Sequence, residues 1–208
     1  IVALAMFFAY QRVTQTLALE RDRELTRLAA GQLSVQLNPY VQDLDALARL
    51  SAINRADAAT QAAALRAASN RLVVFDGGVV ILNSRGRVSA TAPERADIIG
   101  ADWSDRDYFR EIVAFSAPVF SNILADGPDG ANVITIAVPV IGDQGEFRGV
   151  LAGMFKLGPT AVSALYGSIA KLQVADLSSA YVVDGHGRVI YDGEFAAIGQ
   201  DVSAQPAV

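Results

Sequence analysis

The apolar positions at the start of the chain form one unbroken run. Residues 1–10, IVALAMFFAY, offer half of the roughly 20 apolar residues that a helix needs to span a bilayer. Because the chain begins at Ile rather than Met, we expect this run to be the outer end of a transmembrane helix whose start is missing, with Tyr10 at the membrane–water interface. A signal-peptide remnant and a buried helix are the alternatives.

A helical period continues through residues 11–71. Three apolar residues that share one face are Leu25, Leu28 and Val35. Asn38-Pro39 should kink or interrupt this helix, after which the period resumes, and a second, alanine-rich helix is expected at about 57–70. A helix of this length needs a surface to pack on, and a plain coiled coil that pairs two copies of the chain would supply one.

At Leu72 the period changes from helix to strand. Apolar stretches separated by turns predict five antiparallel strands, at residues 73–82, 87–90, 118–124, 132–141 and 147–157. One helix lies between the second and third strands, and Pro139 marks an edge or a bulge. Residues 72–158 are therefore predicted to be an α+β half-barrel that follows the long helix.

Part of this module recurs later in the chain, where residues 180–203 resemble 79–104. The matching runs are Gly86-Arg87-Val88 with Gly187-Arg188-Val189, and residues 99–104 with 198–203. We infer two related modules in tandem, of which the second is truncated. Residues 159–208 would hold a connecting helix at about 160–172 and this partial second module.

Composition narrows the function classes. An apolar fraction of 52% is ample for a core, and a net charge of −5 without a long basic run argues against nucleic acid as a partner. The chain has no cysteine, which excludes a disulfide framework and a thiolate metal site. Its single histidine, His186, has no evident partners for a zinc site or a catalytic triad, so we expect no metal and no cofactor.

Residues 100–111, GADWSDRDYFRE, carry the densest group of chemically active side chains. Ser104 is a good helix N-cap and Asp107 completes a capping-box-like pair, which gives these residues a structural role. The remaining members of interest are Arg106, Trp103, Tyr108 and Phe109. A guanidinium held between rings suits a small carboxylate because its planar fork matches two oxygens. The stretch is either one wall of a ligand pocket or a surface arginine stacked on core aromatics.

The order of these parts resembles the double Cache (dCache) sensor domain, a PAS-like fold, over essentially the whole chain. The most specific pieces are the Ser-Asp-Arg-Asp-Tyr-Phe run at 104–109, the Gly-Val-Leu-Ala-Gly run at 149–153 and the residues 181–201. In that family a membrane helix leads into a long helix, a pocket-bearing distal module and a degenerate proximal one. Its members are extracytoplasmic input domains of histidine kinases, chemoreceptors and diguanylate cyclases. The resemblance implies a domain on the periplasmic or extracellular side of the inner membrane.

The resemblance also implies a ligand site. Amino-acid-binding members carry Arg, one spacer and Trp-Tyr, with an Asp on the last strand for the ligand's amine. Arg106 matches the Arg, whereas Tyr108 and Phe109 replace Trp and Tyr. The Asp position falls on Met154, which cannot balance an ammonium group, and Lys156 lies on the same strand face. These departures predict a small organic anion rather than an amino acid as the ligand.

Three of the site positions have simpler alternatives. Ser121 either lines the site or is a polar group on an edge strand. Trp103 is either a lid residue or part of the core. Lys156 is either a second cation of the site or a strand charge that faces solvent.

Three functions are compatible with the sequence. The first is a small-molecule sensor in which binding in the distal module shifts the long helix and so signals across the membrane. The second is a secreted hydrolase that uses Asp102, Asp105 or Asp107, although no nucleophile and base pair stands out, so we expect no catalytic residues in this fragment. The third is a ligand-free dimerisation module whose pocket is filled by its own side chains.

Overall fold

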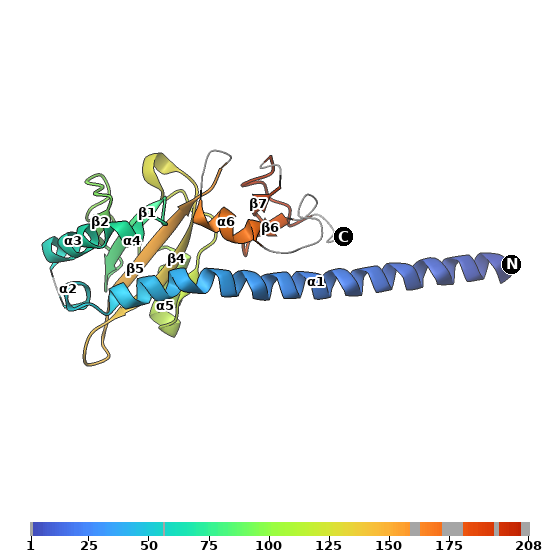
Figure 1. The fold of residues 1–208 in the computed structure, drawn as a ribbon, viewed down its shortest axis with the longest axis horizontal. Coiled ribbons are helices and arrows are strands. Elements are labelled where there is room, and N and C mark those ends of the chain that lie inside the picture. The colour runs from blue at the N-terminus through green and yellow to red at the C-terminus, as the bar shows by residue number, and fades with distance from the viewer. Residues whose placement is uncertain (1, 56, 159–162, 172–180, 194–195, 205–208) are drawn as a thin grey trace.

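The computed structural model describes residues 2–55, 57–158, 163–171, 181–193 and 196–204. One long helix, α1 (Val2–Ala48), extends well beyond a five-stranded sheet that packs against its C-terminal part (Figure 1). Its 47 residues correspond to a length of about 70 Å at the rise of an α-helix. Within the described residues, no helix combines the length and the apolar character of a membrane span.

Pro39 lies inside α1, so the predicted interruption of this helix does not occur. A proline leaves the carbonyl group four residues earlier, here that of Val35, without its helical hydrogen bond. Both residues lie on the exposed side of α1, where water can satisfy that carbonyl. The opposite side buries Leu37, Leu44 and Leu47 in the core and holds the helix together across the proline.

Three short helices lead from α1 to the sheet: α2 (Ser51–Asn54), α3 (Ala58–Ala67) and α4 (Ser69–Leu72). The carboxylate of Asp57 caps α3 by accepting a hydrogen bond from the backbone N–H of Thr60 at 2.9 Å. The first strand begins at Gly78 rather than at residue 73, because backbone hydrogen bonds from Phe75 to Leu72 and from Gly78 to Phe75 make two turns first.

The sheet confirms the predicted α+β class, with five antiparallel strands in the order β2-β1-β5-β4-β3. The strands are β1 (Gly78–Asn83), β2 (Val88–Ala92), β3 (Val119–Phe120), β4 (Val133–Ile141) and β5 (Phe147–Lys156). β3 is shorter than predicted and is followed by a single bridge between Leu124 and Val133. Pro139 of β4 lies beyond the end of β3, where the sheet has an open edge.

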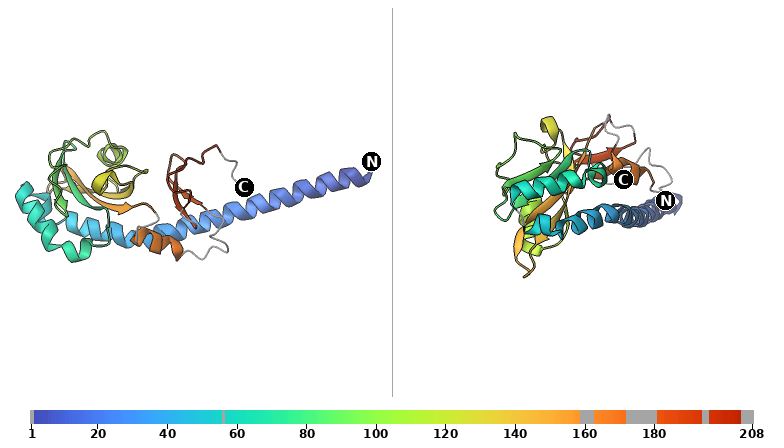
Figure 2. Two further views of the ribbon diagram at one scale, coloured as in Figure 1. Left: turned by 90° about the horizontal axis from the view of Figure 1, so that it is seen from above. Right: turned by 60° about the vertical axis from the view of Figure 1, so that its left-hand side comes forward.

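The two faces of the sheet bury two separate clusters. The C-terminal part of α1 runs along one of these faces (Figure 2). The face against α1 includes Val79, Ile81, Leu151 and Phe155, and the face against α5 (Asp107–Phe115) includes Val80, Leu82, Ala152 and Met154. This is the alternation expected of strands that are buried on both sides. It places Met154 beneath the helix that carries the predicted pocket residues.

The second module contributes α6 (Ala164–Ala170) and the hairpin of β6 (Tyr181–Val183) and β7 (Val189–Asp192). The predicted repeat is visible in its turn: Gly187 has φ 77°, as Gly86 has φ 75°, and both conformations favour glycine. The bridge between Arg188 and Asp201 likewise corresponds to that between Arg87 and Asp102. The ends of the predicted connecting helix, at 160–162 and 172, lie outside the described residues.

Candidate ligand-binding site

Helix α5 begins at Asp107, three residues after the predicted N-cap. The side chain of Asp102 accepts a hydrogen bond from the backbone N–H of Ser104 at 3.0 Å, which holds this stretch as a turn. Ser104 is therefore not the N-cap; Arg106 occupies that position, without a capping side-chain bond. Arg106 therefore lies at the start of α5 and not within the helix.

The aromatic residues of this stretch are buried. Tyr108 is 1% exposed, and Trp103 and Phe109 are each 6% exposed. Together with Ile112 they pack on the α5 face of the sheet, in the same cluster as Met154. The burial of Trp103 is that expected of a core residue, the alternative to its role as a lid.

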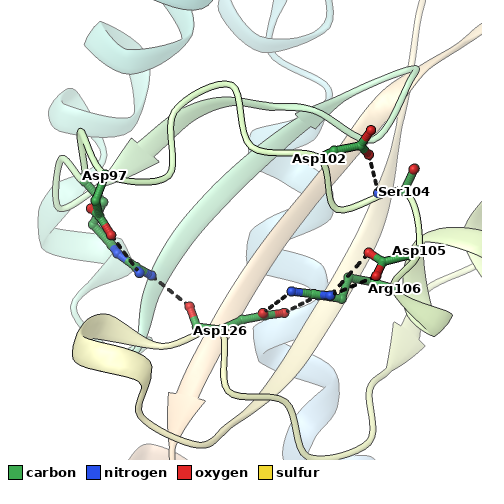
Figure 3. A network of polar contacts seen from close by, with 7 residues as sticks. Asp97, Asp102, Ser104, Asp105, Arg106 and Asp126 are labelled. Atoms are coloured by element: carbon green, nitrogen blue, oxygen red, sulfur yellow. Dashed lines mark hydrogen bonds and ion pairs between the residues drawn. The ribbon is translucent and has the colours of Figure 1, made fainter.

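Arg106 holds two carboxylates (Figure 3). Its Nε donates to Oδ2 of Asp126 at 2.9 Å and its Nη2 donates to Oδ1 at 2.7 Å, a bidentate pair. Its Nη1 lies 3.2 Å from both carboxylate oxygens of Asp105, and its Cζ lies 5.6 Å from the ring centroid of Trp103. The hydrogen bonds with Asp126 raise the pKa of Arg106 although burial opposes the change, so its positive charge is secure.

Asp126 is the residue of this site that the sequence did not reveal. It is 7% exposed, and its backbone carbonyl also accepts a hydrogen bond from Nη1 of Arg95 at 2.8 Å. The sequence predicted only a turn or loop at 125–130, and a Gly- and Pro-rich loop has no periodicity that could relate one of its acids to Arg106. The one indication in the sequence is the residue type, because a half-buried guanidinium is usually paired with a carboxylate and the loop contains two aspartates.

The hydroxyl of Tyr108 is buried and has no hydrogen-bond partner among the residues that the structure describes. Burial raises the pKa of this hydroxyl strongly, and the carboxylate of Asp126 acts in the same direction, so it stays protonated. A buried hydroxyl without a partner is uncommon in proteins. It leaves the site with one polar group that is unused in the ligand-free protein.

The three remaining predicted residues are buried or hydrogen-bonded to groups other than Arg106. Met154 is 1% exposed in the cluster below α5. Lys156 is half-buried at the end of β5, and its backbone N–H donates to the carboxylate of Asp76 at 2.9 Å. The hydroxyl of Ser121 donates to the carbonyl of Asn122 and accepts from the backbone N–H of Thr135, which matches its alternative as a polar group on an edge strand.

The acids considered for hydrolysis have structural contacts. Asp102 caps the turn at Ser104, and the hydrogen bonds from Ser104 lower the pKa of its carboxyl group. Asp105 pairs with Arg106, and Asp107 pairs with Arg110 one turn along α5. None of these contacts sets a nucleophile beside a base.

Two cavities lined by described residues lie away from Arg106. One of about 670 Å³ lies between α1 and the turn after β4, and its lining includes Asn54. The other, of about 610 Å³, lies between α1, α6 and the β6–β7 hairpin, and Ser121 is part of its lining. Neither is lined by Arg106, whose bidentate face is filled by Asp126.

Comparison with known proteins places this geometry in a family. The family model for the Cache domain, dCache_1, matches residues 11–206. The chain belongs to this family. Among curated proteins, no relative matches this Cache domain.

Solved structures give the same fold at low sequence identity. An extracellular ligand-binding receptor from Desulfohalobium retbaense DSM5692 superimposes with a TM-score of 0.65 at 22% identity; the match covers 86% of the Cache domain described above but 32% of that chain. The ligand-binding domain of the Pseudomonas aeruginosa PAO1 amino acid chemoreceptor PctC, in complex with GABA, gives 0.62 at 20% identity over 89% and 81% of the two chains. That of the Pseudomonas fluorescens chemoreceptor CtaA, in complex with L-serine, gives 0.61 at 17% identity over 86% and 73%.

Proposed function

We propose that this Cache domain is the extracytoplasmic small-molecule sensor of a transmembrane receptor, and that Arg106 binds the carboxylate of the ligand. The observation that carries the proposal is the bidentate pair of Arg106 and Asp126. A guanidinium that already holds one carboxylate in this geometry can hold a ligand carboxylate in the same way. Binding then exchanges one ion pair for another, and Asp126 must leave the guanidinium.

The charge of Asp126 bears on the class of ligand. A simple organic anion would displace a carboxylate that is 7% exposed and leave it without a cation, which is costly. A zwitterion offers a carboxylate to Arg106 and an ammonium group to Asp126, so that both protein charges stay paired. Asp126 thus supplies the negative charge that Met154 cannot provide. We therefore favour an amino acid or a related zwitterion over the organic anion predicted from the sequence.

The named ligands of the structural relatives agree with this preference. GABA in PctC and L-serine in CtaA each carry one carboxylate and one amine. At identities of 20% and 17% these structures support the fold, while the ligand class rests on the charges of Arg106 and Asp126.

Calorimetry with matched pairs of ligands tests the proposal. GABA and butyrate, or alanine and propionate, differ by the amine alone. The wild-type domain should bind one of the zwitterions and not its partner acid. Arg106→Ala should abolish binding, while Arg110→Ala, on an exposed arginine of the same helix, should leave it unchanged. Binding that survives in Arg106→Ala would remove this residue from the site.

Asp126→Asn separates the two ligand classes. This variant empties the guanidinium of its internal carboxylate and removes the partner of a ligand amine. Affinity should fall for a zwitterion, because the ammonium group loses its counter-charge. An organic-anion sensor would respond in the opposite direction, with tighter binding of the acid.

A ligand-free dimerisation module is the second candidate, and the filled face of Arg106 favours it. In that case Asp126 is a permanent partner and α1 pairs two copies of the chain. Both ligand classes can be screened by calorimetry and thermal shift against wild type and Asp126→Asn. If neither protein shows binding heat or a thermal shift, the result supports this candidate over the sensor.

A further inference from the structure

Residues 121–126 connect the candidate site to the second module. At one end, Asp126 is held by Arg106 and Arg95. At the other end, Asn122 and Ile123 contact the turn between β6 and β7. Two backbone hydrogen bonds between Leu124 and Val133, at 3.0 and 2.8 Å, keep the middle of this connector extended along the edge of the sheet.

The turn between β6 and β7 binds both backbone polar groups of Ile123, its N–H and its carbonyl. Oδ2 of Asp184 accepts a hydrogen bond from the backbone N–H of Ile123 at 3.0 Å, and the guanidinium of Arg188 donates to the carbonyl of Ile123. Oδ1 of Asn122 accepts from the backbone N–H of Gly185 at 2.8 Å. A backbone segment that is bound through its N–H, its carbonyl and the neighbouring side chain has a fixed position.

The repeated turn of the first module shows which part of this contact is additional. There Asn83 makes the same turn: its Oδ1 accepts from the backbone N–H groups of Arg85 and Arg87, as Oδ1 of Asp184 does from those of His186 and Arg188. Asn83 is exposed, whereas Asp184 is 8% exposed. An amide therefore suffices for the turn. The second carboxylate oxygen of Asp184 binds the connector at Ile123 and also accepts from Nε of Arg188 at 3.3 Å, the same guanidinium that donates to the carbonyl of Ile123.

We infer that Asp184 of the second module is a positioning residue for the candidate site of the first, because it fixes the connector that carries Asp126. Asp126 follows Ile123 by three positions, a reach of about 10 Å in an extended chain, so a shift at one end of the connector moves the other. This inference rests on the proposed function. When a ligand displaces Asp126 from Arg106, the connector shifts and biases the position of the β6–β7 turn. By thermodynamic linkage, a change in the turn alters ligand affinity by the same factor.

Asp184→Asn tests the inference, because it keeps the acceptor that the turn needs and removes the one that binds Ile123. Ligand affinity should change about fivefold or more, the lower end of typical coupling between sites. Amide hydrogen exchange at Ile123 should become faster, while exchange at Arg188, whose N–H bonds within the turn, should stay slow. Asp201→Asn is the matched control, since its carboxylate caps Ser203 in the same module. Unchanged affinity together with unchanged exchange at Ile123 would overturn the inference.

A double-mutant cycle makes the test independent of any ligand. Asp126→Asn and Asp184→Asn are compared singly and together by urea unfolding. Coupling through the connector predicts that the combined effect on the unfolding equilibrium constant departs from the product of the single effects by more than about twofold, and a multiplicative result contradicts it. Non-multiplicative effects in a domain that binds neither ligand class would retain the coupling and reject the proposed function. Should Asp184→Asn fail to fold, Asn122→Ala replaces it in the cycle.

Discussion

At the scale of single residues, two polar groups of the candidate site differ in whether they are hydrogen-bonded. The carboxylate of Asp126 is engaged by Arg106, whereas the buried hydroxyl of Tyr108 has no partner in the described part of the chain. A buried hydroxyl without a hydrogen bond costs stability, because it has lost water and gained nothing. Such a group is tolerated most readily where a ligand can supply the missing partner.

Tyr108→Phe should therefore stabilise the ligand-free domain. The substitution removes the unpaired hydroxyl and keeps the ring that packs below α5, so the free energy of unfolding should rise by about 1 kcal/mol. Urea unfolding of the ligand-free domain measures this. Tyr40→Phe serves as the control, because the hydroxyl of Tyr40 lies 3.4 Å from that of Ser168 and its removal should not stabilise. A clear loss of stability in Tyr108→Phe would mean that the hydroxyl has a partner after all.

Asp76 makes stability depend on pH in an unusual direction. Burial raises the pKa of its carboxyl group, and the hydrogen bond from the backbone N–H of Lys156 only partly opposes this. A raised pKa means that the folded state prefers the protonated acid. Its contribution to stability is therefore fully present below the unfolded-state pKa of about 3.9 and is lost as the pH rises through the higher folded-state value.

Asp76→Asn keeps the acceptor for Lys156 and removes the charge. The variant should be more stable than wild type at pH 7, and the difference should shrink as the pH falls toward 4. Thermal unfolding between pH 4 and 7 measures the trend. Asp57→Asn is the comparison, because hydrogen bonds from Thr60 lower the pKa of that exposed cap and predict the opposite sign. A gap between wild type and Asp76→Asn that widens in acid would reverse the assignment.

At the scale of elements, glycines decide how closely β5 can approach its neighbours. A Cβ built on Gly153 would lie 2.5 Å from Cδ1 of Phe75, on the face of the sheet that packs against α1. Gly31, on the exposed side of α1, has no atom within 4 Å of such a Cβ. The first glycine is therefore required by packing, while the second is a helix position with room for a methyl group.

The pair Gly153→Ala and Gly31→Ala should change stability in opposite directions. Overpacking against Phe75 should lower the free energy of unfolding by about 1–3 kcal/mol in the first. Higher helix propensity should raise it by up to about 1 kcal/mol in the second. Urea denaturation of both variants beside wild type gives the comparison, and a neutral Gly153→Ala would show that Phe75 can move aside at little cost.

The elements themselves were largely predictable, and the exceptions have local causes. Period and turn residues predicted all five strands of the sheet, although β3 is shorter than expected, and also the helix between β2 and β3 and the repeated turn at Gly86 and Gly187. Pro39 failed as a helix breaker because its freed carbonyl faces solvent while the other side of α1 packs on the sheet. Asp126 escaped notice because its partner is 20 residues away in sequence, and only the fold brings loop and helix start together.

At the scale of the whole molecule, α1 is the element that could carry a change in the sheet toward a membrane. It packs on the sheet through one side and leaves Leu25, Leu28 and Val35 exposed on another, at 39%, 61% and 71%. Leu28 and Val35 are seven residues apart, the spacing of one position in successive heptads. We expect a second copy of the chain to cover this stripe, so that the two α1 helices move together.

Val35→Glu should weaken that association without unfolding the domain, because the side chain of Val35 is exposed and is not part of the core. Sedimentation velocity should show a concentration-dependent dimer for wild type and a monomer over the same range for the variant. Ser34→Glu adds the same charge at an exposed position about 100° around the helix from Val35, away from the stripe, and should leave the dimer intact. A chain that stays monomeric at high concentration in its wild-type form would leave α1 to act singly. Ligand binding at Arg106 would then have to be transmitted along one helix rather than between two.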